Sequence, residues 1–224
     1  MSFGDKKLSE IAVSVPGSTS LLREYDLDFC CGGSDTLSNA AAEKGLNLAE
    51  IETRLTELQN SKAENPEEYW VNATYPEIID HILVRYHKRH REQLQELIVL
   101  ADRVESVHGD RDDCPIGVAA ELRNVYDDLS NHMMKEEHVL FPMIKAGNYM
   151  MAQMPIRMME MEHAEHGEHL DVLKSLTNNM TPPADACNTW RALYSGIQEF
   201  ADDLMMHIHR ENNILFPRVI AENN

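Results

Sequence analysis

Residues 132–142 read HMMKEEHVLFP, and residues 207–217 read HIHRENNILFP. One pattern therefore occurs twice: His-x-x-x-Glu, two further residues, Val or Ile, and then Leu-Phe-Pro. A second, weaker pair relates residues 87–94 to residues 163–170, because both contain His-x-x-His-x-x-x-Leu. The two pairs alternate along the chain, which predicts a domain made of two helical hairpins of one design.

The regions around these motifs show the periodicity of helices. Apolar residues recur at spacings of three and four, while strand signals are almost absent. Four long helices are expected at 76–107, 115–144, 155–177 and 184–220, each opening at or just after a proline. The connections between them are short, so neighbouring helices should be antiparallel. The expected fold class is all-α, with an up-down-up-down four-helix bundle.

Each of the four inward-facing apolar stripes is interrupted by ionisable residues. His132 and Glu136 are four residues apart and so lie on one helix face, as do His207 and Glu211. In antiparallel hairpins, an early position on one helix faces a late position on the next. Six side chains therefore fall into one layer of the bundle interior: His87, His132, Glu136, His163, His207 and Glu211.

This set of side chains predicts a metal centre. Four imidazoles and two carboxylates exceed the needs of one tetrahedral zinc ion. They suit two metal ions, each with two imidazoles, that share both carboxylates as bridges. Such ligands favour iron or manganese, and iron is the preferred interpretation. We expect two non-haem iron ions per chain, with an oxo bridge among the oxygen-type ligands.

The other ionisable residues of the bundle are not expected to bind a metal directly. His90 and His166 lie on the same seams one turn deeper, where packing or hydrogen bonding around the ligands is expected. Glu137, Glu160 and Glu162 are expected to be solvated, with the alternative that Glu162 lines an entry path for iron. Four histidines fall off the seams and are also expected to be solvated: His81, His138, His169 and His209.

Methionines are abundant near this layer. Thioethers prefer softer metals than iron, so we interpret these methionines as residues that fill gaps in the core. The residues concerned are Met133, Met134, Met158, Met159, Met161, Met205 and Met206.

The first sixty residues are predicted to form a small helical domain. Short helices are expected at 18–25, 36–44 and 48–58. The polar stretch that follows indicates a linker. The predicted organisation is a small domain at 1–60, a linker at 61–75 and the bundle at 76–222.

The small domain contains the sequence Cys30-Cys31-Gly32-Gly33. Its glycines predict an exposed turn, and a following helix would lower the pKa of the two thiols. Cys30 and Cys31 are therefore candidate reactive thiols for iron transfer or for contact with another protein; the alternative is an incidental surface feature. Cys114 and Cys187 are expected to be buried small residues.

Composition excludes several classes of protein. The formal net charge is −18, which disfavours binding to nucleic acid and to anionic membranes. The N-terminus lacks the apolar core of a signal peptide, and no apolar run approaches a membrane span. The cysteines do not form a disulfide framework. These features indicate a protein of the reducing cytoplasm.

The whole chain resembles the iron-sulfur cluster repair di-iron family, also called repair of iron centres proteins. The resemblance is carried by residues 28–33, 84–87, 132–137, 162–163 and 207–217. It implies a small domain with a Cys-Cys-Gly-Gly motif, a hemerythrin-like bundle, and a homodimer. The family's di-iron ligands carry over onto the six residues of the layer. The resemblance also implies a cytoplasmic stress-response protein that restores clusters damaged by oxidants or nitric oxide.

Three functions remain open from the sequence. The favoured one is cluster repair by iron donation, with damaged iron-sulfur proteins as clients. The second is a carrier or sensor that binds nitric oxide or dioxygen at the di-iron site. The third is a reductase of nitric oxide or peroxide, for which the sequence shows no flavin or nicotinamide motif; we therefore lean against an enzyme.

Overall fold

The computed structural model describes residues 2–61 and 63–222. Within these residues the regular structure is helical, apart from an isolated bridge between Lys7 and Thr36, which confirms the all-α prediction. The chain divides into two compact units: Ile79–Met205, and Met1–Ile78 together with Met206–Asn224. The boundaries predicted at residues 60 and 76 stay a prediction. Throughout the described part of the chain, every helix is too short or too polar to cross a membrane.

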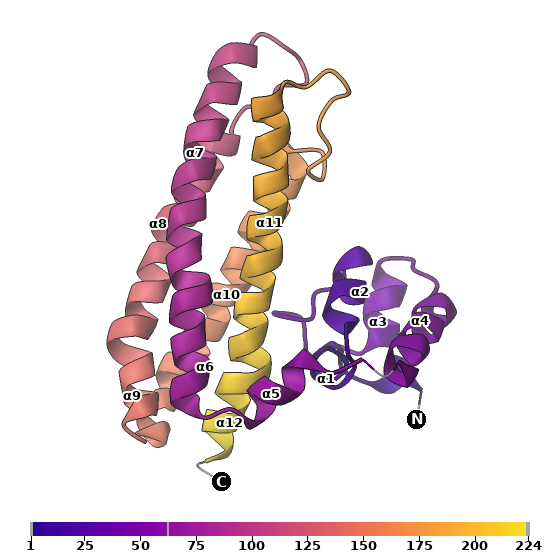
Figure 1. The fold of residues 1–224 in the computed structure, drawn as a ribbon, viewed down its shortest axis with the longest axis vertical. Helices are drawn as coiled ribbons and strands as arrows, with labels where there is room; N and C mark the ends of the chain where they lie inside the picture. The colour runs from indigo at the N-terminus through magenta and orange to yellow at the C-terminus, as the bar shows by residue number, and fades with distance from the viewer. Residues whose placement is uncertain (1, 62, 223–224) are drawn as a thin grey trace. The chain divides into compact units, whose positions relative to one another are not determined.

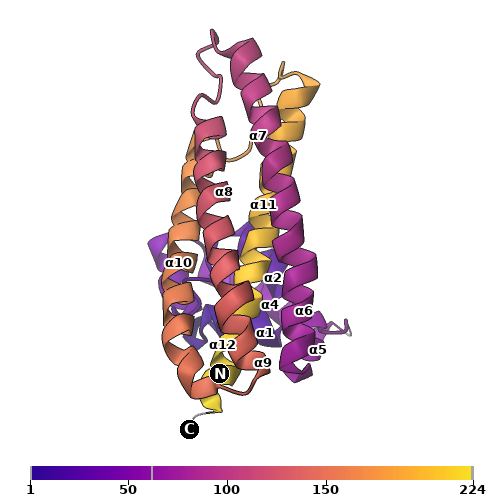
Figure 2. The same ribbon diagram turned by 90° about the vertical axis from the view of Figure 1, so that its left-hand side faces the viewer.

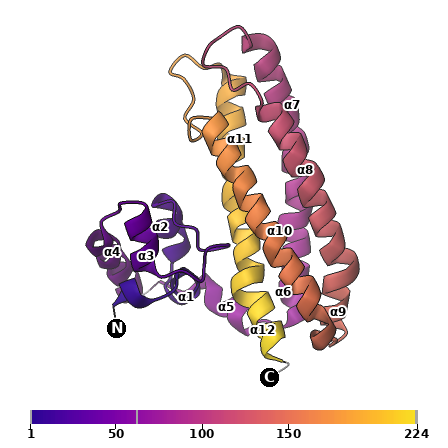
Figure 3. The same cartoon turned by 180° about the vertical axis from the view of Figure 1, so that it is seen from behind.

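The unit Ile79–Met205 is the predicted up-down-up-down bundle. Its long helices are α7 (Lys88–His108), α8 (Val118–Lys135), α10 (Tyr149–Leu176) and most of α11 (Asn188–Arg210). Figures 1 and 2 show them running antiparallel to their neighbours in the chain. Helix α8 packs against α7 and α10, as can be followed from behind in Figure 3.

Helices α7 and α11 also approach each other closely. A Cβ atom on Gly196 of α11 would lie 2.6 Å from the end of the Leu97 side chain of α7, so any larger residue there would force that side chain to move. At the surface, Arg89 pairs with Glu199 at 3.1 Å. The contact between these helices is therefore apolar inside and charged at its edge.

In the part of the chain that the structure describes, three π-helical turns interrupt the long helices. They are η2 (Ile82–His87), between α6 (Tyr75–His81) and α7; η3 (Glu136–Leu140), between α8 and α9 (Phe141–Lys145); and η4 (Glu211–Leu215), between α11 and α12 (Phe216–Ala221). The repeated Leu-Phe-Pro sequence explains the last two. Pro142 and Pro217 lack the N–H that an α-helix would donate to the carbonyl four residues earlier, so the helix widens just before each proline.

The π-turn at η3 changes which residues face the core. The uninterrupted helical period predicts Val139 on the inward seam, but Val139 is 44% exposed and Leu140 is 1% exposed. A π-turn takes up an extra residue, so it rotates every following side chain. The prediction for Val139 is wrong for this reason.

Two helix starts differ from the prediction by more than one helical turn. Helix α10 begins at Tyr149, after a turn in which Gly147 has a φ of 74°, so Pro155 lies inside it. Helix α11 begins at Asn188 because the preceding residues form a separate turn, in which Arg191 donates to the carbonyls of Ala184 and Ala186.

The other unit contains the short helices. They are η1 (Phe3–Asp5), α1 (Leu8–Ser14), α2 (Ser18–Glu24), α3 (Leu37–Glu43), α4 (Leu48–Asn60) and α5 (Pro66–Asn72). Helices α2, α3 and α4 match the three predicted helices. Helix α5 lies within the stretch predicted as a linker, and α1 was not predicted. Helix α1 packs on α2, on α5 and on η4.

Candidate metal centre

The six residues of the predicted layer are all buried. None is more than 1% exposed. They form two groups whose ligand atoms lie within 4.8 Å of one another. The first group is His87, Glu136, His207 and Glu211, and the second is His132, Glu136, His163 and Glu211. Both groups contain both carboxylates, so the arrangement suits two metal ions that share Glu136 and Glu211.

The π-turns place three of these residues. His87 is the last residue of η2, Glu136 is the first of η3, and Glu211 is the first of η4. Single π-turns inside α-helices occur frequently at functional sites, because the extra residue re-aims a side chain. The π-turn η3, which turns Val139 out of the core, therefore begins at Glu136, one of the two shared carboxylates.

The ring nitrogens and carboxylate oxygens converge. Nε2 of His87 lies 3.3 Å from Oε2 of Glu136, and Nε2 of His132 lies 3.4 Å from the same oxygen. The Nε2 atoms of His132 and His163 are 3.1 Å apart. Nε2 of His207 lies 3.4 Å from Oε1 of Glu211. Every one of these four histidines thus directs Nε2 into the layer.

Two further carboxylates, outside the ligand groups, contact the Nδ1 atoms of two of these histidines. Nδ1 of His87 lies 2.8 Å from Oε1 of Glu137, and Nδ1 of His132 lies 3.0 Å from Oε2 of Glu162. A carboxylate at Nδ1 favours the tautomer with hydrogen on that nitrogen, which leaves the Nε2 lone pair for a metal. Carboxylate–histidine pairs of this kind are the usual support of metal ligands.

The expectation that Glu137 and Glu162 are solvated is therefore wrong. Hydrogen bonds from His87 and Arg91 lower the pKa of Glu137 to about 2. A hydrogen bond from His132, and another from Lys135 at 2.5 Å, lower the pKa of Glu162. Both carboxylates stay charged. The expectation holds for Glu160, which is exposed.

The donor set fits a metal. Glu136 is fully buried, and neither of its carboxylate oxygens accepts a hydrogen bond. Burial acts to raise its pKa, but the neighbouring His132 and His87 outweigh burial and hold the pKa well below its ordinary value. A buried charged carboxylate without hydrogen bonds is costly unless a cation compensates it. Nitrogen and oxygen ligands in this ratio suit iron or manganese.

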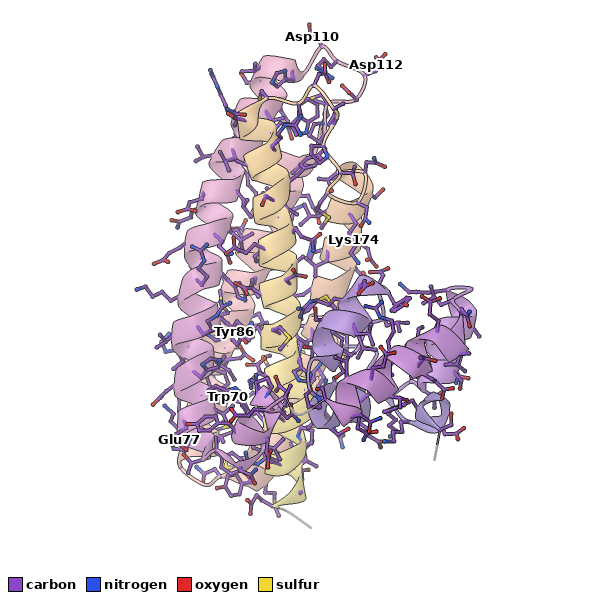
Figure 4. All side chains as sticks on the ribbon, turned by 45° about the vertical axis from the view of Figure 1, so that its right-hand side comes forward. Trp70, Glu77, Tyr86, Asp110, Asp112 and Lys174 are labelled. Atoms are coloured by element: carbon purple, nitrogen blue, oxygen red, sulfur yellow. The ribbon has the colours of Figure 1, made fainter. Side chains whose placement is uncertain are left out.

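His90 and His166 lie in the core but outside both ligand groups. The His90 ring stacks on Tyr86, which Figure 4 labels, with centroids 6.1 Å apart, and it meets the edge of Phe200 at 5.4 Å. The His166 ring meets His132 edge-on at 4.9 Å. These ring contacts agree with the packing role expected for both residues.

The thiol loop differs from its prediction. Cys30 is only 5% exposed and Cys31 is half-buried, with their sulfur atoms 3.7 Å apart. Asp28 accepts hydrogen bonds from the backbone N–H of Cys30 at 3.0 Å and of Cys31 at 2.9 Å. The hydrogen bond with Cys31 and then burial raise the pKa of Cys30 well above its ordinary value. The next helix begins only at Leu37, so its N-terminus does not activate the thiols.

The loop is attached to η4. The side-chain amide of Asn212 donates to the carbonyl of Cys30 at 2.9 Å, and that of Asn213 donates to the carbonyl of Phe29 at 2.8 Å. The corresponding residues of the first repeat are Glu137 and His138. The two asparagines thus replace a glutamate and a histidine of the first repeat. This difference in sequence indicates that the two π-turns have different neighbours.

His209 was expected to be solvated but is fully buried. Its ring meets Phe29 edge-on at 5.4 Å, and its Nε2 lies 3.4 Å from Oε2 of Glu67. Glu67 also forms a buried ion pair with Arg210. Helical periodicity places His209 on an outer face, and only contacts from distant residues bury it.

Other cysteine and histidine predictions are corrected as well. Cys187 is exposed and Cys114 is half-buried, so neither is a buried core residue. His169 is half-buried, between Glu121 at 2.6 Å and Asp128 at 3.1 Å. His138 is exposed, as expected.

Comparisons with known proteins identify the families to which the two parts of the chain are similar. Residues 78–219 match the family described as "Hemerythrin HHE cation binding domain", and residues 4–59 match ScdA_N, "Domain of Unknown function (DUF542)". A "Probable iron-sulfur cluster repair protein" of Haemophilus influenzae is 68% identical over 99% of this chain and 100% of its own length.

Two further relatives bear a similar name. The "Iron-sulfur cluster repair protein YtfE" of Musicola paradisiaca is 55% identical over 98% of each chain. The protein of the same name from Escherichia coli O8 is 54% identical over 99% of each chain. With a family match across the bundle and relatives that align over nearly its whole length, this chain belongs to the hemerythrin HHE cation binding domain family.

Proposed function

We propose that this protein is a di-iron protein that repairs iron-sulfur clusters damaged by oxidative or nitrosative stress, by supplying iron. The observation that carries the proposal is the pair of buried ligand groups that share Glu136 and Glu211. The names of the full-length relatives support it. Bound iron would be redox-active and would be the cargo of the repair reaction.

The proposed centre contains two non-haem iron ions, with an oxo bridge. His87 and His207 would hold one ion, and His132 and His163 the other, with both carboxylates shared. Glu137 and Glu162 keep the rings of His87 and His132 oriented through their Nδ1 atoms. The chain's own contribution is thus a preformed nitrogen-rich pocket with oriented ligands.

Cys30 and Cys31 are the proposed contact for iron in transit or for a damaged client protein. Together with Asp28 they offer three ligand atoms within 4.8 Å of one another. The raised pKa of Cys30 keeps that thiol protonated at neutral pH, and binding of a metal would displace the proton. We place the reaction in the cytoplasm, with iron-sulfur proteins as clients and a homodimer as the assembly.

The test is recovery of a damaged cluster enzyme. The iron-loaded protein is incubated anaerobically with an enzyme whose cluster has been damaged by nitric oxide, and the activity of that enzyme is followed. Recovery should track the iron lost from the repair protein. The matched control is Glu160→Gln, which removes an exposed carboxylate of α10, while Glu136→Leu removes a shared ligand. Equal recovery with wild type and with Glu136→Leu would contradict the proposal.

One observation favours a second candidate. All six ligands are buried, which suits a small ligand such as nitric oxide or dioxygen. A di-iron carrier or sensor of these molecules would bind them reversibly and would not lose iron to a client. Anaerobic titration with nitric oxide, followed by absorption spectra and by the iron content after gel filtration, separates the two functions.

A further inference from the structure

Helix α10 carries an exposed row of methionines. Met150, Met151, Met154, Met158 and Met161 are between 51% and 76% exposed. Met158 and Met161 were expected to fill gaps in the core, and the structure shows that they do not. Met159, which lies between them in the chain, is 3% exposed and is the core methionine of this segment.

The exposed methionines share one face of the helix. At about 100° of rotation per residue, all five fall within an arc of about 100°. The core residues of the same helix, which include Ile156, Met159 and His163, lie on the opposite side. The methionine face is thus separate from the ligand layer, although both belong to one helix.

The spacing brings thioethers close to one another. Met151 and Met158 lie three residues before and four residues after Met154, and side chains at these spacings are neighbours on a helix surface. Methionine side chains are flexible and polarizable, so three sulfur atoms from this triplet can converge on one ion. Among the exposed charged side chains of α10, Arg157 borders this face and Glu165 lies within it, one turn beyond Met161.

We propose that the methionine face of α10 binds Cu(I), with Met151, Met154 and Met158 as its ligands. Thioether sulfur is a soft ligand and selects Cu(I), whereas iron and manganese prefer the imidazole and carboxylate groups of the buried centre. Divalent copper, which forms when Cu(I) is oxidised, binds such nitrogen and oxygen sites more tightly than ferrous iron does. A surface site for Cu(I) would therefore hold copper away from the iron ligands. This inference does not depend on the proposed repair function.

The test is a competition for Cu(I) against bicinchoninate, under anaerobic conditions. The iron-loaded full-length protein is used, so that the buried centre is filled, and its thiols are first alkylated with iodoacetamide. The Met151→Leu, Met154→Leu, Met158→Leu triple variant should bind Cu(I) at least tenfold more weakly than the parent. Leucine keeps the size and the helix propensity, and circular dichroism checks the fold.

The matched control is the Met143→Leu, Met180→Leu double variant, which changes two half-buried methionines outside α10. It should bind Cu(I) as the parent does, and X-ray absorption of the parent should show sulfur around copper. Equal Cu(I) affinity of the parent and the triple variant would overturn the proposal. If the parent and the triple variant bind Cu(I) equally and sedimentation shows that the triple variant has lost a dimer, the face would be assigned to contact with a second copy of this chain.

Discussion

The side-chain amide of Asn212 donates a hydrogen bond to the backbone carbonyl of Cys30 at 2.9 Å, and Asn212 directly follows Glu211 in the chain. The thiol loop is thus tied to the π-turn that begins at a shared carboxylate of the candidate metal centre. Asn213 provides the second tie, to Phe29. The loop is positioned by η4 rather than being a free surface turn.

Replacing Asn212 by Ala should therefore loosen the thiol loop. The loss of one hydrogen bond of about 1 kcal/mol predicts a roughly fivefold faster alkylation of Cys30, because the buried thiol opens more often. The measurement is the rate of modification by iodoacetamide, resolved by peptide mass spectrometry. Asn72→Ala is the control, since the Asn72 side-chain amide donates a hydrogen bond to the backbone carbonyl of Glu68 within α5. An unchanged rate at Cys30 would show that the tie to η4 does not restrain the loop.

The second prediction concerns Glu136. Its replacement by Leu should reduce the iron content below two per chain, because both ligand groups lose a shared carboxylate. The same change should destabilise the metal-free protein at neutral pH, because His132 and His87 hold the pKa of Glu136 well below its ordinary value and the charged carboxylate therefore stabilises the folded state. Iron analysis and urea unfolding of the metal-free protein measure the two effects. A variant that keeps two irons would remove Glu136 from the ligand set.

A third prediction separates the thiols from the metal centre. The Cys30→Ala, Cys31→Ala double variant should retain its full iron content, because neither cysteine belongs to the two ligand groups of the bundle. Its repair of a damaged cluster enzyme should be strongly reduced. Cys187→Ala, which removes an exposed thiol elsewhere, is the control. Repair at the wild-type rate by the double variant would leave the bundle acting alone.

The fourth prediction is a pH dependence of stability at His169. Burial acts to lower the pKa of His169, but Glu121 and Asp128 outweigh burial and raise it above its ordinary value of 6.5. A raised folded-state pKa means that the stabilisation is fully present below pH 6.5 and is lost as the pH rises through the higher folded pKa.

Compared with wild type, His169→Gln should thus be less stable by about 1 kcal/mol or less at pH 5.5, the range for a partly exposed ion pair. The difference should diminish in alkaline solution. Urea unfolding at both pH values tests the prediction, with His138→Gln as an exposed control. A stability difference that grows with pH would show that the sign is wrong.

Local rules were sufficient to predict the layer of metal-binding candidates. The spacing of His132 and Glu136 places both on one helix face, and short connections make the helices antiparallel, so all six side chains share a level in the bundle. The repeat of this pattern at His207 and Glu211 supported the same conclusion. Residues within one or two turns of each other determine such features, and their relationship is visible in the chain itself.

Contacts between distant residues decided the rest. Phe29 and Glu67 bury His209, and Asn212 holds the loop that carries Cys30, although these partners lie far apart in the sequence. A π-turn exposes Val139 because it rotates the helix by an extra residue after Glu136. Periodicity assumes a regular helix with one inner face. The sequence by itself therefore determined the helices, the bundle and the set of candidate ligands. Tertiary packing decided the burial of His209, the burial and raised pKa of Cys30, and the orientation of the ligand rings by Glu137 and Glu162.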